Sequence, residues 1–120
     1  MVQRYVKAYN NFDVERMLVD MADDVKFENI VDGLVTLSIE GKEALKDQME
    51  NAKNLFSKRT QTISGIHYSK DYIEIRVDYS AIVAVDLPNG LKAGDPIELK
   101  GKSIFLFRDK KIIELKDIAE

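Results

Sequence analysis

The chain is organised around residues 72–85, in which apolar and polar positions alternate. This period of two, together with many β-branched and aromatic residues, is typical of a β-strand. At about 3.3 Å per residue, the predicted strand would cross a small domain from side to side. Arg76 and Asp78 lie two positions apart in its middle, so we expect their side chains to leave the same face of the sheet.

Apolar residues recur at helical spacing in three segments, all of which precede this strand. They predict helices over residues 2–10, 14–22 and 42–57. Asp13 is a suitable N-cap for the second helix, and Gly41 directly precedes the third.

The other apolar segments predict further strands. Two short ones precede the third helix, and three others flank the long strand: 25–30, 34–40, 60–69, 97–108 and 111–118. Helices therefore come first, and four strands joined by hairpins follow. This order predicts an α+β fold with a curved, largely antiparallel sheet and helices on one face.

Composition and charge mainly argue against certain classes of function. The 120 residues are enough for a single domain, residues 1–120. A net charge of −3 provides no basic surface for nucleic acid, and the absence of cysteine beside a single histidine, His67, argues against a metal site. We expect no cofactor. Because the amino terminus resembles a polar helix and no apolar run approaches the ~20 residues of a membrane span, we expect no membrane association and a cytoplasmic location.

The order of elements resembles the nuclear transport factor 2-like fold, which SnoaL-like and ketosteroid isomerase-like proteins share. The resemblance covers the whole chain, and four segments carry it: VQRYVKAYNNFD (2–13), MADDVKFEN (21–29), GKEAL (41–45) and SIFLFRDKKIIELKD (103–117). It implies a cone-shaped sheet with three helices on its concave face and a pocket between them. Since this fold hosts isomerases, cyclases, hydrolases, dehydratases and non-catalytic adaptors, it does not by itself give a function.

Ketosteroid isomerase is the first family to compare. Tyr5 falls at the position of that family's oxyanion-hole tyrosine. Asn29, however, replaces the catalytic aspartate, and Ser103 replaces the protonated aspartic acid. An amide cannot abstract a proton at neutral pH, so the resemblance argues against ketosteroid isomerisation.

Limonene epoxide hydrolase is the second family, and its working residues have counterparts here. By resemblance, Asp117 would be the base, Asp78 the acid, Arg76 the bridge between the two carboxyls, and Asn29 a group that holds the water. Phe27 departs from the family, which has a tyrosine at this position. The expected pocket is completed by side chains that would line it: Tyr5, Phe27, Met17, Met49 and Phe105.

The alternation in the long strand bears on this assignment. Arg76 and Asp78 share their face with polar residues, whereas the opposite face is almost wholly apolar. If the charged pair points into a pocket, the apolar face must be buried elsewhere, and we predict a homodimer that buries Ile75, Val77, Tyr79, Ala81 and Val83. If that face instead packs under the helices, Arg76 and Asp78 lie in water.

The resemblance thus implies a cofactor-independent enzyme that adds water to an apolar epoxide. A catalytically silent module that binds a small apolar molecule is the alternative from another class. An isomerase or polyketide cyclase-like proton transfer is a third possibility, weakened by the missing aspartate at Asn29.

Overall fold

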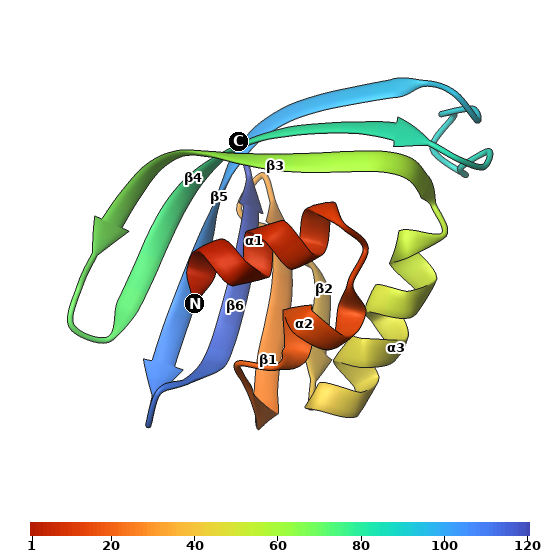
Figure 1. Cartoon of the computed structure of the whole chain (residues 1–120). Helices are drawn as coiled ribbons and strands as arrows, with labels where there is room; N and C mark the ends of the chain where they lie inside the picture. Colours follow the sequence, from red (N-terminus) through yellow and green to blue (C-terminus); the bar gives the residue numbers. More distant parts are fainter.

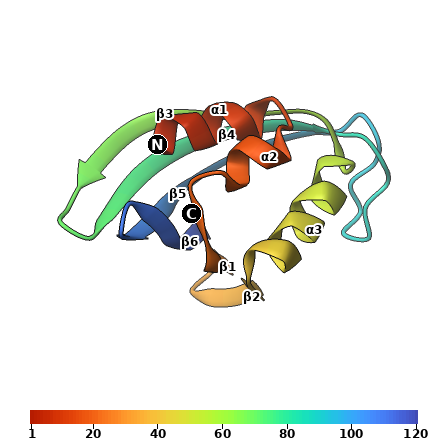
Figure 2. The same ribbon diagram turned by 60° about the horizontal axis from the view of Figure 1, so that its bottom comes forward.

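A curved six-stranded sheet wraps around three helices in the computed structural model, which describes residues 1–120 (Figures 1 and 2). The predicted α+β architecture is confirmed. The elements in chain order are α1 (Val2–Asn10), α2 (Val14–Leu18), β1 (Met21–Val31), β2 (Leu34–Glu40), α3 (Lys42–Lys53), β3 (Phe56–Tyr68), β4 (Tyr72–Val83), β5 (Pro96–Arg108) and β6 (Lys111–Ala119).

The strands lie in the order β2-β1-β6-β5-β4-β3. Every neighbouring pair is antiparallel except β1 and β6, which run parallel. The last strand in the chain thus lies inside the sheet and joins the β1–β2 hairpin to the three long strands β3, β4 and β5. None of the helices is long and apolar enough to span a membrane.

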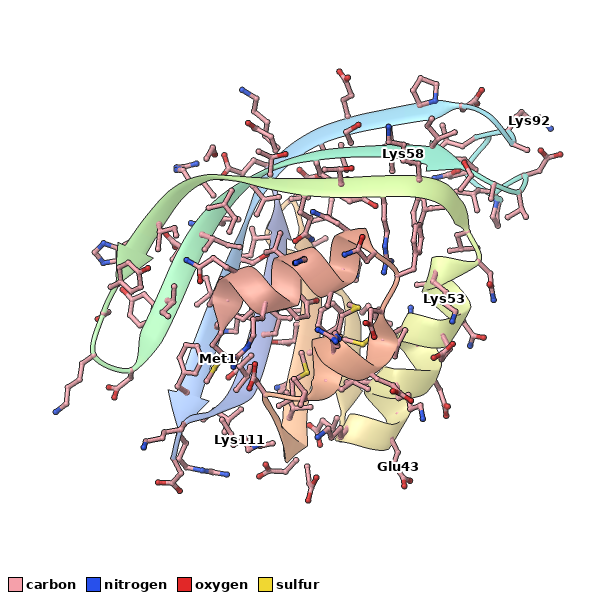
Figure 3. The ribbon with its side chains drawn as sticks, viewed as in Figure 1. Met1, Glu43, Lys53, Lys58, Lys92 and Lys111 are labelled. Carbon is pink, nitrogen blue, oxygen red and sulfur yellow. The ribbon has the colours of Figure 1, made fainter.

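The core lies between the concave face of the sheet and the helices. Tyr5 and Val6 of α1, Leu45 of α3, and Phe105 and Leu115 of the central strands are all buried there. Charged side chains such as Glu43, Lys58 and Lys111 extend away from this layer into solvent (Figure 3).

The apolar face of β4 belongs to the interior of a single chain. Ile75, Val77, Ala81 and Val83 are between 0% and 6% exposed without any partner subunit. The prediction that a homodimer buries this face is therefore wrong, because these side chains are already buried within one chain.

Two predicted helices are longer than the observed ones. The second ends at Leu18 rather than at residue 22, because Met21 already pairs with Ile112 on β6. The third ends at Lys53 rather than at residue 57, because Phe56 pairs with Val83 on β4. In both places the helical spacing of apolar residues continues into a strand whose side chains point into the same core.

Candidate active site

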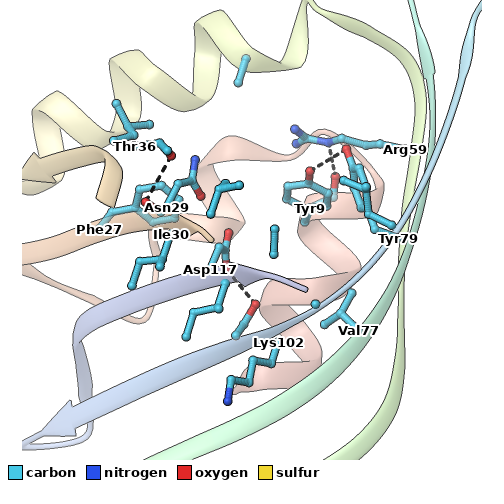
Figure 4. Close-up of a pocket in the computed structure, with 18 of the residues that line it drawn as sticks. Tyr9, Phe27, Asn29, Ile30, Thr36, Arg59, Val77, Tyr79, Lys102 and Asp117 are labelled. Carbon is cyan, nitrogen blue, oxygen red and sulfur yellow. Dashed lines mark hydrogen bonds between the residues drawn. The ribbon is translucent and has the colours of Figure 1, made fainter. Parts of the chain in front are cut away.

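A cavity of about 380 Å³ lies between the helices and the sheet (Figure 4). Of the 25 residues that line it, 16 are hydrophobic, so it favours an apolar ligand. Tyr5, Met17, Phe27 and Met49 line it, as the sequence predicted. Phe105 does not line the cavity, because its side chain is fully buried. Its ring packs edge-on against that of Tyr5, with the ring centres 5.4 Å apart.

Three polar side chains form a row across the middle of the sheet. Asn29 on β1 pairs with Asp117 on β6, and Asp117 pairs with Ser103 on β5. Residues paired in this way point to the same face of a sheet, and all three line the cavity. The row exists because the parallel pairing of β1 with β6 brings together residues 88 positions apart in the sequence.

Asp117 is the carboxylic acid of the cavity. Burial raises its pKa from the ordinary value of 3.8 to about 6, and a hydrogen bond from Ser103 partly offsets this rise. In that bond the Ser103 hydroxyl donates to Oδ1 of Asp117 at 2.7 Å. A carboxyl with a pKa near 6 can both take up and release a proton close to neutral pH, which is what a general base or acid requires.

Tyr5 brings a hydroxyl group from α1 into the same cavity. Its pKa is raised above the ordinary value of 10.0, mainly by burial and further by the nearby charge of Asp117. The hydroxyl consequently keeps its proton at neutral pH. Tyr5 is therefore a hydrogen-bond donor close enough to sense the charge of the carboxyl.

A second cluster of polar side chains, which the sequence pattern did not reveal, lies at the β3 side of the cavity. The Tyr9 hydroxyl donates a hydrogen bond of 3.0 Å to the Tyr79 hydroxyl (Figure 4). Arg59 on β3 lies beside this pair, 3% exposed, with its Nε donating to the backbone oxygen of Tyr9 at 3.0 Å. The predicted strand began at residue 60, which left Arg59 outside the pattern that could have shown its inward direction.

Arg76 and Asp78 lie outside the cavity, on the opposite face of the sheet. Both are exposed, and Nη1 of Arg76 pairs with Glu120 at 3.0 Å. The expected set of Asp78, Arg76, Asp117 and Asn29 is thus divided: the structure brings Asn29 and Asp117 together and leaves the other two in solvent. Strand alternation is the reason, since burying Val77 in the core requires Arg76 and Asp78 to point outward.

A metal site of protein side chains is not formed, because nowhere in the chain do three histidine, cysteine, aspartate or glutamate side chains gather closely enough to hold an ion. The buried polar groups of the cavity include the Asp117 carboxyl, the Arg59 guanidinium and the tyrosine hydroxyls. The other polar residues that line it are Asn29, Thr36, Gln48, Lys100, Lys102 and Ser103, of which Lys100 is exposed and Lys102 half-buried.

The family model of the SnoaL-like domain matches residues 2–115. The chain belongs to this family. Membership of the SnoaL-like family agrees with the curved sheet and three helices of the structure. No curated protein matches the sequence at a significant level.

Solved structures share the whole SnoaL-like fold at low sequence identity. A candidate polyketide cyclase from Xanthomonas campestris pv. campestris is 18% identical with a TM-score of 0.82, covering 99% of this chain and 87% of its own. An LEH-like epoxide hydrolase from M. tuberculosis is 16% identical with a TM-score of 0.77 and coverages of 99% and 79%.

A third similar structure is a protein of ketosteroid isomerase-like fold from Catenulispora acidiphila in complex with trimethylamine. It is 14% identical with a TM-score of 0.77 and coverages of 97% and 82%. At such identities the likeness establishes the fold, which the three proteins share although their descriptions differ. The chemistry must be argued from this chain's own cavity.

Proposed function

We propose that this SnoaL-like protein is a cofactor-independent enzyme that moves a proton on a small apolar substrate, with Asp117 as the general base. One observation supports this proposal most directly: the mostly apolar cavity holds a single carboxyl, that of Asp117, whose pKa is raised to about 6, together with the protonated hydroxyl of Tyr5. At neutral pH this carboxyl is mostly ionised, so it can accept a proton.

The reaction class that needs only these groups is proton abstraction next to a carbonyl. The C–H bond breaks, the proton moves to the Asp117 carboxylate, and the electron pair passes through the carbon framework to the carbonyl oxygen. The Tyr5 hydroxyl donates a hydrogen bond to that oxygen as its negative charge develops. Asp117 then returns the proton to the same or another carbon, which completes an isomerisation or allows a cyclisation.

The base differs in place from the one that the ketosteroid isomerase resemblance implies. That family has its aspartate at the position of Asn29, and the absence of a carboxyl there argued against proton transfer. Asp117 lies beside Asn29 in the sheet register and supplies a carboxyl from β6 instead. The amide of Asn29 remains available to bind the substrate or a water.

The test is hydrogen–deuterium exchange of a small apolar ketone, 2-tetralone, in D₂O, followed by NMR. We expect the wild type to accelerate exchange and Asp117→Asn to lower the enzyme-dependent rate by roughly 10²-fold or more, the usual worth of a general base. Asp78→Asn, on the outer face, is the matched control and should exchange like wild type. Exchange that survives Asp117→Asn would contradict the proposal.

Hydration of an epoxide is the second candidate function. The pairing of Asn29 with Asp117 supports it, because an amide and a carboxylate side by side can hold and deprotonate a water molecule. It lacks the second carboxyl of the expected set, so Tyr5 would have to protonate the departing oxygen. Diol formed from styrene oxide by wild type, with no exchange of 2-tetralone, would favour this reaction.

The non-catalytic binding module remains the alternative from another class. It predicts that apolar molecules enter the cavity while neither 2-tetralone nor styrene oxide reacts. The two assays, run on the same preparation with a binding measurement, separate all three functions.

A further inference from the structure

We propose that the ligand of this cavity is an organic anion, an apolar molecule with one carboxylate group that binds Arg59. This inference deepens the proposed function, because it concerns the same cavity, but it rests on a different group and is tested by binding rather than by turnover.

Arg59 is a buried cation without a counterion. It is 3% exposed, yet it takes part in none of the eight ion pairs of the chain. A buried charge is costly unless it is paired, and buried arginines are usually matched by a carboxylate. The cavity that Arg59 lines offers the space in which such a partner could bind.

The contacts of the guanidinium leave most of its donors unused. Its Nε donates a hydrogen bond to the Tyr9 carbonyl oxygen, and its Nη2 donates only to the Sδ of Met17, at 3.9 Å. The other contacts are with aromatic faces: the central carbon Cζ lies 3.7 Å from the ring centre of Tyr9 and 4.6 Å from that of Phe12. A guanidinium has five N–H donors in a planar fork, a geometry that suits the two oxygens of a carboxylate.

A purely structural role accounts for only part of this arrangement. The bond from Nε ties β3 to the last turn of α1, where a positive charge is favourable. A neutral donor could make that bond as well. The stacking on Tyr9 and Phe12 holds the plane of the guanidinium in place, and that preorganisation reduces the entropy lost when an anion binds.

Asp117, the one carboxyl of the cavity, sets the direction in which such a ligand lies. Both charges act on the Tyr79 hydroxyl: burial raises its pKa, the charge of Arg59 opposes this rise, and the charge of Asp117 adds to it. An anionic group is attracted by Arg59 and repelled by ionised Asp117. The carboxylate should therefore lie at the β3 end, so that another part of the molecule reaches Asp117.

The experiment compares two probes of nearly equal shape, 2-naphthoate and the neutral 2-naphthamide, by titration calorimetry at pH 7.5. We expect wild type to bind the carboxylate at least about tenfold more tightly, as hydrogen bonds to a charged partner commonly provide. Arg59→Met should abolish this preference, and Arg59→Lys should keep part of it, because an ammonium retains the charge but not the fork.

Two control variants separate this inference from the proposed function. Arg76→Met removes an exposed arginine and should leave the preference unchanged. Asp117→Asn should bind 2-naphthoate more tightly than wild type, since it removes a repelling charge, even though we expect it to slow the exchange of 2-tetralone. A preference for the carboxylate in a protein that exchanges no ketone would uphold the ligand class while the proposed reaction fails.

Equal affinity of wild type for the two probes, or no binding of 2-naphthoate, would overturn the proposal. So would an Arg59→Met variant that folds and keeps the preference. If Arg59→Met does not fold, the wild-type comparison and Arg59→Lys decide: a carboxylate preference unchanged by Arg59→Lys counts against Arg59 as the anchor.

Discussion

Ser103 lies directly opposite Asp117 on the neighbouring strand and donates a hydrogen bond of 2.7 Å to its carboxylate. The bond favours the ionised carboxylate, because a hydroxyl donor stabilises negative charge, while burial favours the protonated acid. Burial is the larger effect, so the balance of the two leaves the pKa at about 6. Ser103 is thus a positioning and tuning residue for the proposed base.

Ser103→Ala should raise the pKa of Asp117 above about 6, because only burial then acts on the carboxyl. In the ketone exchange assay the lower limb of the pH profile should move to higher pH, with the rate at high pH less affected. Carbon-13 NMR of the Asp117 carboxyl measures the same shift directly. Ser80→Ala, at an exposed position on β4, is the control, and an unmoved titration in Ser103→Ala would contradict this account.

Asp117→Asn should stabilise the fold at pH 7 by roughly 1 to 3 kcal/mol, since it removes a charge that burial disfavours. The carboxyl titrates near 3.8 when unfolded and near 6 when folded, so between these values the folded chain holds more protons. The stability of wild type should therefore fall as the pH rises through this window and then level off.

Urea unfolding of wild type and Asp117→Asn from pH 3.5 to 8 measures this effect. The advantage of the variant should be greatest above pH 6 and shrink below pH 4. Asp78→Asn, which alters an exposed carboxylate, should show no comparable trend. A variant less stable than wild type at pH 7 would mean that ionised Asp117 contributes to the fold.

Arg76→Ala should leave exchange activity unchanged and cost at most about 1 kcal/mol of stability, because exposed ion pairs contribute little. The side chain of Arg76 is 62% exposed, and that of its partner Glu120 is 41% exposed. Turnover and urea unfolding of this variant are the measurements. A large loss of turnover would mean that Arg76, on the outer face of the sheet, takes part in the reaction after all.

Gly101→Ala should destabilise the chain by roughly 1 to 3 kcal/mol, the usual cost of overpacking. A Cβ at Gly101 would lie 2.6 Å from the backbone oxygen of Ile118, which cannot move without disturbing the pairing of β5 with β6. Gly65→Ala is the matched control, because its nearest neighbour would be the Arg76 side chain at 3.8 Å. Thermal unfolding of both variants tests the contrast, and equal melting temperatures would contradict it.

The sequence contained enough information to predict the architecture and one part of the site. Alternation and helical spacing placed the elements in the right order. In the same alternation Asn29 shares a strand face with Phe27, and Asp117 shares one with Leu115, which indicates an inward direction for both polar side chains. The same pattern favoured an outward direction for Arg76 and Asp78, but the resemblance of these two residues, Asp117 and Asn29 to the limonene epoxide hydrolase set outweighed it. In the structure, the burial of Ile75 and Val77 turns Arg76 and Asp78 outward into solvent.

Arg59 was beyond what the pattern could predict. Its surroundings come from Tyr9, Phe12 and Met17, which lie more than 40 positions away on and around the first two helices. Only the curvature of the sheet, which brings β3 over α1, puts a cation among them (Figure 2). A single charged residue at the beginning of a strand does not show this in the sequence.

The position of β6 within the sheet has a consequence for folding. The β1–β2 hairpin and the β3–β4–β5 meander share no pairing except through this strand, whose partner β1 lies some 90 residues away. Contacts between such distant segments form slowly, because a long loop must close before they stabilise anything. The row of Asn29, Asp117 and Ser103 is therefore assembled in the same step that joins the two halves of the sheet. A chain in which β6 has not yet docked has neither a continuous sheet nor a base in its cavity, so we expect activity and protection of the β6 amides from hydrogen exchange to appear together during refolding.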